Sequence, residues 1–178
     1  MIPKLLILSI MTAMLAGSCK KLADDDISPK TNKLVDTIPD GAYFKLCLLK
    51  DSGRVDETAL LFNHAASPDF DVNLDAAYLP GFGIASLASL TEDNRACAIQ
   101  VLPYRRGEPI NLELDSRNGN NYTLQISAEK NLPSSTRIWI KENRLGDSFE
   151  RRYGNYAFSV LKSDTSSCGN RRFVVILR

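Results

Sequence analysis

Apolar and polar residues alternate along most of the chain after Ala42, with a period of two rather than the 3.6 of a helix. One such run begins at Leu112, a segment with the composition of a turn follows at 117–120, and the alternation resumes at Tyr122. Successive side chains of a strand point to opposite faces of its sheet, so this pattern is typical of half-buried strands. We therefore predict a hairpin that extends to Ile126.

Similar strand-like runs recur, most of them separated by clusters of Gly, Pro, Asn, Asp or Ser. They are Ala42–Lys50, Thr58–Asn63, Gly83–Leu90, Arg95–Leu102, Arg137–Lys141, Asn155–Leu161 and Arg172–Leu177. About nine short strands, with no amphipathic run long enough for a good helix, predict an all-β fold, namely an antiparallel β-sandwich with Greek-key or jelly-roll-like connections. Phe173–Leu177 is apolar on both faces, so the last strand is predicted to lie centrally in its sheet.

The N-terminus has the features of an export signal. Leu5–Ala16 is an apolar run of about a dozen residues, too short to span a bilayer but suited to the apolar region of a signal peptide. The small residues Ala16–Ser18 precede Cys19 and resemble the lipobox of bacterial lipoproteins, in which the Cys is acylated and becomes the first residue. The resemblance implies a signal peptide over 1–18, a lipid on Cys19 and attachment to the outer membrane. The alternative is a plain signal peptide with an incidental Cys.

Residues 19–41 are polar and carry few large apolar side chains, so we predict a flexible tether that leads to a β domain over 42–178. Within the tether, Asp24, Asp25 and Asp26 resemble the acidic export signal of surface lipoproteins in the Bacteroidota, which implies a position on the cell surface. The alternative is a solvated cluster of charges. Thr37 follows an Asp and precedes an Ile, a pattern that exporters of that phylum O-glycosylate, and it is a candidate glycosylation site.

Short motifs follow one another in a set order between Tyr43 and Leu177. They include Tyr43–Leu46, Asp51–Gly53, Glu57–Phe62, Phe70–Asp71, Ile84–Leu90, Ala98–Pro103, Trp139–Asn143, Tyr156–Phe158 and Arg172–Val174. In this order they resemble a β-sandwich module of secreted and surface proteins of the Bacteroidota, often found beside a type IX secretion sorting domain. The resemblance implies a non-catalytic passenger or stalk region and assigns no functional residue.

Acidic residues at alternate positions suggest a cation site. Asp69, Asp71, Asn73 and Asp75 resemble the start of a calcium loop, but Leu74 and Pro80 stand where an EF-hand needs Gly and Glu. An EF-hand is therefore excluded, and a calcium site of another kind stays a weak candidate. The favoured alternative is a polar loop held by Asx turns.

Three cysteines remain once Cys19 is assigned to the lipid. Cys97 lies on the same strand face as Ile99 and Val101, and Cys168 lies in the turn before the last strand, so we predict a disulfide between Cys97 and Cys168 in an oxidising compartment. The alternative is three separate residues, with Cys47 and Cys97 as small buried apolar groups.

Charge and histidine content narrow the classes of partner and site. Lys and Arg total 22 against 21 Asp and Glu, and a net charge of +1 gives no general attraction for nucleic acid. His64 is the single histidine, which excludes zinc centres built from several histidines. No motif implies a cofactor, and we expect none.

Aromatic side chains give the one indication of a ligand. If Tyr104, Trp139 and Tyr153 share a surface, they could stack on the flat apolar faces of sugar rings; the alternative is packing within the fold. We expect a non-enzymatic, surface-anchored lipoprotein that acts as an adhesion, scaffold or envelope-interaction module, held to the membrane by its lipid and in contact with a surface glycan or envelope protein. The alternative is a glycan-binding lipoprotein of a nutrient-capture system. A hydrolase built on Glu113 and Asp115 is a third hypothesis.

Overall fold

The computed structural model describes residues 37–81, 83–150 and 154–178. It begins with an antiparallel hairpin of β1 (Tyr43–Lys50) and β2 (Gly53–Phe62). Asp51 and Ser52 form its two-residue turn and have φ angles of 49° and 65°. A tight hairpin turn with positive φ at both central residues matches the right-handed twist of the strands it joins.

Strands make up nearly all of the remaining regular structure. They are β3 (Ala76–Ala77), β4 (Ala85–Leu90), β5 (Ala96–Leu102), β6 (Pro109–Ser116), β7 (Asn120–Lys130), β8 (Ile138–Glu142), β9 (Ser148–Glu150), β10 (Tyr156–Val160) and β11 (Gly169–Leu177). A short 3-10 turn, Thr165–Ser167, precedes β11. In the part of the chain that the structure describes, no helix is long and apolar enough to cross a membrane. The prediction of an all-β fold is confirmed.

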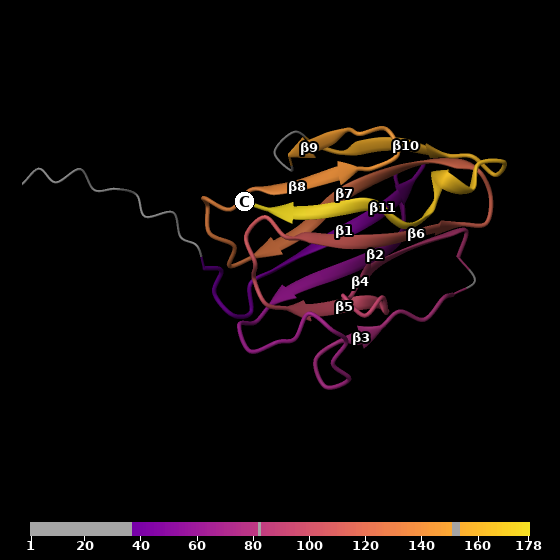
Figure 1. The fold of residues 1–178 in the computed structure, drawn as a ribbon. Coiled ribbons are helices and arrows are strands. Elements are labelled where there is room, and N and C mark those ends of the chain that lie inside the picture. Colours follow the sequence, from indigo (N-terminus) through magenta and orange to yellow (C-terminus); the bar gives the residue numbers. More distant parts are fainter. Residues whose placement is uncertain (1–36, 82, 151–153) are drawn as a thin grey trace, which may run out of the picture. The chain divides into compact units, whose positions relative to one another are not determined.

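The strands form one continuous sheet in the order β10-β7-β1-β2-β5-β4-β6-β11-β8-β9, and β3 pairs with β5 beside this path (Figure 1). The prediction of an antiparallel sandwich of about nine strands is wrong in two respects. The sheet has eleven strands, and β2 pairs with β5 in parallel. A parallel pair needs a long crossover, which here is the chain between Asn63 and Arg95.

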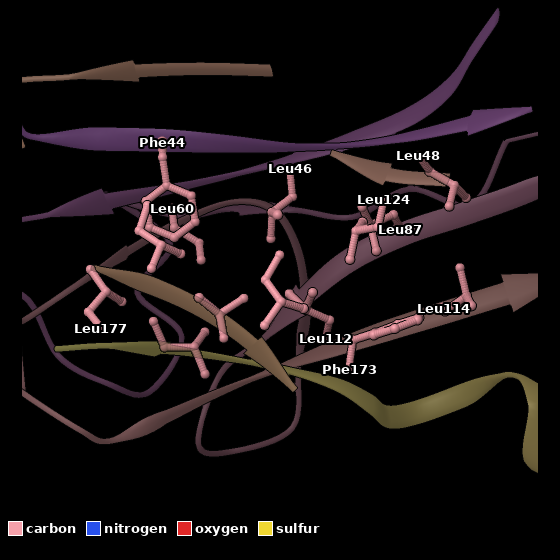
Figure 2. Packing of buried hydrophobic residues seen from close by; sticks show 14 of the residues in the cluster. Phe44, Leu46, Leu48, Leu60, Leu87, Leu112, Leu114, Leu124, Phe173 and Leu177 are labelled. Carbon is pink, nitrogen blue, oxygen red and sulfur yellow. The ribbon is translucent and has the colours of Figure 1, made fainter. Parts of the chain in front are cut away.

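The sheet curls over, so that its two halves face each other across one apolar core. Figure 2 shows side chains of β1, β2 and β7 lying close to side chains of β4, β6 and β11. The first group includes Phe44, Leu46, Leu48, Leu60 and Leu124, and the second includes Leu87, Leu112, Leu114, Phe173 and Leu177. All ten are at most 1% exposed, so this layer supplies the main apolar burial of the fold.

The hairpin predicted between Leu112 and Ile126 does not form. The strands β6 and β7 belong to different halves of the sheet: β6 pairs with β4 and β11, and β7 pairs with β1 and β10. The turn between them carries the chain across the core, and the Ser116 hydroxyl bonds there to the Tyr122 hydroxyl at 2.8 Å. Alternation correctly predicts which side chains face the core, but it does not identify the partner strand.

A buried threonine joins the two halves where β2, β4 and β5 meet. The Thr58 hydroxyl is fully buried, donates to the Cys97 carbonyl oxygen at 3.1 Å and accepts from the Ser89 backbone amide at 3.2 Å. This one side chain therefore bonds to β5, the neighbour of β2, and to β4, the next strand in the order. The bonds satisfy polar groups whose burial without a partner would cost free energy.

The last strand is central, as the sequence predicted. β11 lies between β6 and β8, and Phe173, Val175 and Leu177 are at most 1% exposed. The two ends of the strand order also lie close together, because the Phe149 ring of β9 stacks on the Tyr156 ring of β10 with centroids 4.6 Å apart.

An ion pair is fully enclosed between β8 and β11. Arg172 Nε lies 3.0 Å from Glu142 Oε1, and both side chains are at most 2% exposed. The Arg172 guanidinium also donates to the carbonyl oxygens of Ser159 and Ser167, and the Leu145 amide donates to Glu142 Oε2. Most of the hydrogen-bonding capacity of both charges is thereby used, which burial of an ion pair requires.

The folded body begins before Ala42. Ile38 is 8% exposed and belongs to the apolar core, and the Gly41 amide donates to the Phe62 carbonyl oxygen at 2.9 Å. Residues 37–41, assigned to the tether by their polar composition, therefore pack against the β domain.

Candidate functional site

A cavity of about 50 Å³ lies at one end of the core, beside the loop that joins β5 to β6. It is formed where β2, β5 and β11 end and β6 begins. Its apolar walls are Phe62, Leu90, Leu102, Ile110 and Leu177. The amide of Gly107 donates to the Leu177 carbonyl oxygen at 2.8 Å, which fixes the loop against the end of β11.

A buried polar side chain, Gln100, lines the cavity beside these apolar walls, and we call the space the Gln100 cavity. Gln100 is 3% exposed. Within the described ranges, its Oε1 is the one buried side-chain oxygen or nitrogen that has no hydrogen-bond partner. An unpaired buried acceptor costs free energy, so Gln100 is a buried polar group that the fold leaves unsatisfied beside the cavity.

The strand pattern of β5 explains why sequence reasoning missed Gln100. The sequence places Ile99 and Val101 on one strand face and Gln100 on the other; Ile99 is 41% exposed, whereas Gln100 and Leu102 are buried. The inward face of β5 therefore carries a glutamine. A polar residue between apolar ones is the pattern of an outward position, so the sequence held no signal that would have singled out Gln100.

Charged and aromatic side chains surround the mouth of the Gln100 cavity. Arg105 Nη1 lies 3.2 Å from both Glu92 Oε1 and Glu108 Oε2. The Tyr104 ring packs edge-on against Phe62 with centroids 6.1 Å apart. Tyr104 also lines a neighbouring hollow that contains His64. The mouth thus combines one aromatic face with groups that donate and accept hydrogen bonds.

The neighbouring hollow is held by a hydrogen-bonded pair, His64 and Asp40. The backbone amide of His64 donates to Asp40 Oδ1 at 2.8 Å, and the His64 ring nitrogen Nδ1 lies 2.5 Å from Asp40 Oδ2. These bonds, led by the one from the backbone amide, hold the pKa of Asp40 below its ordinary value. Since the pair fastens the loop after β2 to the chain before β1, its first role is structural.

The structure gives the predicted aromatic residues different surroundings. Tyr104 lies at the Gln100 cavity, whereas Trp139 on β8 lies 5.9 Å from the Arg178 guanidinium. Tyr153 lies outside the described residues. Of the two described residues, Tyr104 is the one that borders this cavity.

In the candidate calcium loop, the carboxylates of Asp71 and Asp75 accept hydrogen bonds from backbone amides. The Asp75 carboxylate accepts from the amides of Asp71 and Val101, and Asp71 Oδ1 accepts from the Asn73 amide. Asp69 donates its amide to Ser67 Oγ. Across the described residues, no three or more His, Cys, Asp or Glu side chains gather as a metal site. This arrangement fits the alternative of a loop held by Asx turns.

The carboxylates Glu113 and Asp115 do not share a cleft. Asp115 lines a separate cavity with Asp56 and Tyr78, and Glu113 is not among the residues around it. Asp56 Oδ2 accepts from the Tyr78 hydroxyl at 2.7 Å and from the Leu87 amide at 2.8 Å. Burial first, and then the Asp56 carboxylate, raise the pKa of Tyr78 to about 12, so this hydroxyl serves as a structural donor at neutral pH.

The predicted disulfide between Cys97 and Cys168 is wrong. Both are free cysteines, as is Cys47. Cys97 lies in β5 and Cys168 directly precedes β11, and β4 and β6 lie between these two strands in the sheet. Burial raises the pKa of Cys47 and raises that of Cys97 to about 12. The alternative interpretation, with Cys47 and Cys97 as buried small groups, describes the structure.

We expect iodoacetamide at pH 8 to modify Cys168 first and to reach Cys47 and Cys97 only when the chain unfolds, because the thiolate is the reactive form. Folding favours the protonated Cys97 thiol. The contribution of the Cys97 thiol to the stability of the fold is therefore fully present below pH 9.0, the ordinary pKa of the group. This contribution is lost as the pH rises towards the folded-state pKa of about 12. Peptide mapping by mass spectrometry locates the modified residues. A peptide pair linked through Cys97 and Cys168 in a non-reducing digest would show that the predicted disulfide does form.

The remaining predicted sites lie at or before the start of the described chain. Thr37 is exposed, so its hydroxyl is accessible to a modifying enzyme. Cys19, Asp24, Asp25 and Asp26 lie outside the described residues and stay predictions. Comparisons with protein-family models, with curated proteins and with solved structures find no match for this chain.

Proposed function

We propose that this protein is a non-enzymatic lipoprotein, anchored in the outer membrane and facing the cell surface, whose β domain is an adhesion, scaffold or envelope-interaction module. The observation that carries the proposal is the lipobox-like Ala16–Cys19 segment directly after a short apolar run. The acidic residues Asp24–Asp26 support a position on the outer face. In the β domain, the carboxylates of Asp56 and Asp75 are engaged in hydrogen bonds within the fold, which is compatible with a binding role.

Replacing Cys19 by Ser is expected to release the protein from the membrane fraction, because a lipid chain contributes about 0.8 kcal/mol of membrane affinity for each buried methylene group. The measurement is fractionation of cells with metabolic labelling by a radioactive fatty acid. Cys168→Ser, the same substitution at a partly exposed thiol of the β domain, is the matched control and should keep both label and membrane attachment. Label on the Cys19→Ser chain would contradict the proposal.

A second function, glycan binding, is favoured by one specific observation. Tyr104 borders the Gln100 cavity beside Arg105, Glu92 and Glu108. An aromatic face next to groups that donate and accept hydrogen bonds matches the two kinds of surface that a sugar ring presents. The test is direct binding of simple sugars to the purified full-length chain, with Tyr104→Ala as the variant that removes the aromatic face.

A further inference from the structure

The Gln100 cavity has an apolar interior and a charged mouth. The buried apolar side chains of its lining are at most 8% exposed, and they are Phe62, Leu90, Leu102, Ile110 and Leu177. The charged side chains of its lining are 61%, 43% and 54% exposed, and they are Glu92, Arg105 and Glu108. A ligand that fills this space therefore has an apolar end inside the cavity and a polar end at the mouth.

The mouth carries more negative than positive charge. Arg105 Nη1 lies 3.2 Å from one carboxylate oxygen of Glu92 and 3.2 Å from one of Glu108. Among the described residues of the lining these three are the charged ones, so the mouth has a net charge of −1. Each carboxylate has a second oxygen that can accept a hydrogen bond from a ligand. The mouth is therefore complementary to a cation and repels an anion.

The interior limits the size of the apolar end. A space of about 10 to 15 Å³ holds one sphere the size of a water molecule, so about 50 Å³ accommodates roughly four non-hydrogen atoms. The side chains of leucine and isoleucine each have four carbon atoms, whereas the side chain of phenylalanine has seven. The interior therefore fits a branched aliphatic side chain and excludes an aromatic ring.

The N-terminus of a polypeptide carries the groups that the cavity and its mouth require. The side chain, the ammonium group and the carbonyl group of the first residue are all attached to one α-carbon. With the side chain in the interior, the ammonium group lies at the mouth, where Glu92 and Glu108 accept its hydrogen bonds and balance its charge. Arg105 has N–H donors for the carbonyl oxygen. Tyr104 also lines the cavity, and aromatic rings attract ammonium ions.

We propose that the Gln100 cavity binds the N-terminus of a polypeptide that begins with leucine or isoleucine. The apolar walls select the first side chain, and Glu92 and Glu108 select the free ammonium group. The inference rests on the proposed role of the β domain as an envelope-interaction module, and it names the chemistry by which the domain recognises a partner.

The first experiment varies the ligand in NMR titrations of the purified full-length chain. The main probe is leucyl-glycinamide. Glycyl-glycinamide lacks the aliphatic side chain and should bind at least tenfold more weakly, since each buried methylene group contributes about fourfold in affinity. Phenylalanyl-glycinamide exceeds the interior and should also bind at least tenfold more weakly. N-acetyl-leucyl-glycinamide has no ammonium group and free leucine adds a carboxylate, so each should bind at least threefold more weakly.

The second experiment reverses the charge of the mouth. Glu92→Gln/Glu108→Gln changes the net charge of the mouth from −1 to +1, so leucyl-glycinamide should bind at least fivefold more weakly. The anion 4-methylpentanoate has the same branched chain and should bind this variant more tightly than it binds the parent. Glu113→Gln/Asp115→Asn changes the charge of the chain equally outside the cavity lining, and this control should bind as the parent does. A purely structural effect would weaken both ligands together.

The possible failures are distinguishable. If glycyl-glycinamide or the acetylated peptide binds as tightly as leucyl-glycinamide, the site is overturned. If free leucine binds as tightly, the ligand is an amino acid and the polypeptide is overturned. If the charge-reversed variant keeps the preference of the parent, the role of the carboxylates is overturned. If no peptide binds, the site is overturned, while Cys19→Ser decides the membrane anchor and the sugar titrations decide glycan binding separately.

Discussion

A chain that ends before Phe173 is expected to lose its cooperative unfolding transition. β11 pairs with β6 on one side and β8 on the other, so its loss leaves two ladders open. Phe173, Val175 and Leu177 are fully buried, and each contributes about 1.5 to 3 kcal/mol, against a total stability of about 5 to 15 kcal/mol. Thermal melts followed by circular dichroism measure the effect.

The matched control for this truncation removes residues at the other end of the chain. Deletion of residues 20–36 spares Ile38, which is part of the core, and should leave the melting temperature nearly unchanged. A cooperative melt that survives the loss of residues 173–178 would contradict the central position of β11 and the sheet order that depends on it.

Breaking the enclosed ion pair between Arg172 and Glu142 is also expected to lower the free energy of unfolding by a large amount. Removal of one partner by Glu142→Gln or Arg172→Met is expected to cost about 3 to 5 kcal/mol, because the other side chain keeps its burial but loses the opposite charge. Urea denaturation measures the loss, with an unchanged slope to show that the two-state transition is preserved. Arg54→Met breaks an exposed pair with Glu57 and should cost about 1 kcal/mol or less.

The double variant Glu142→Gln/Arg172→Met distinguishes an ion pair from two separate buried groups. Since it leaves no charge alone in the interior, it should be more stable than the sum of the two single effects predicts. Simple additivity would mean that the two side chains act independently, through their bonds to Leu145, Ser159 and Ser167.

The sequence predicted the features that depend on local side-chain pattern. The all-β class and the central last strand follow from period-two alternation and from the apolar run at Phe173, because both record which faces are buried. Strand partners could not be derived in this way. The turn after Leu112 leads to a strand in the other half of the sheet, and β2 pairs in parallel with β5 across a long connection.

The candidate site was predictable only in part, and for a related reason. Tyr104 is a possible glycan contact from the sequence alone, because it is an aromatic residue outside the strand-like runs, and it borders the Gln100 cavity. Gln100 itself was not predicted, since a polar residue between Ile99 and Val101 has the pattern of an outward position. Which face of β5 turns inward depends on its pairing with β2 and β4, and such long-range pairing leaves no mark on the local pattern.

The stacking of Phe149 on Tyr156 bears on how neighbouring copies behave when crowded. Open strand edges can pair with other chains and seed aggregation. Within the described residues, the outermost strands β9 and β10 have three and five residues, and the stacked rings bring them together. Short edges of this kind offer little length for intermolecular pairing, so copies at high local density would stay separate.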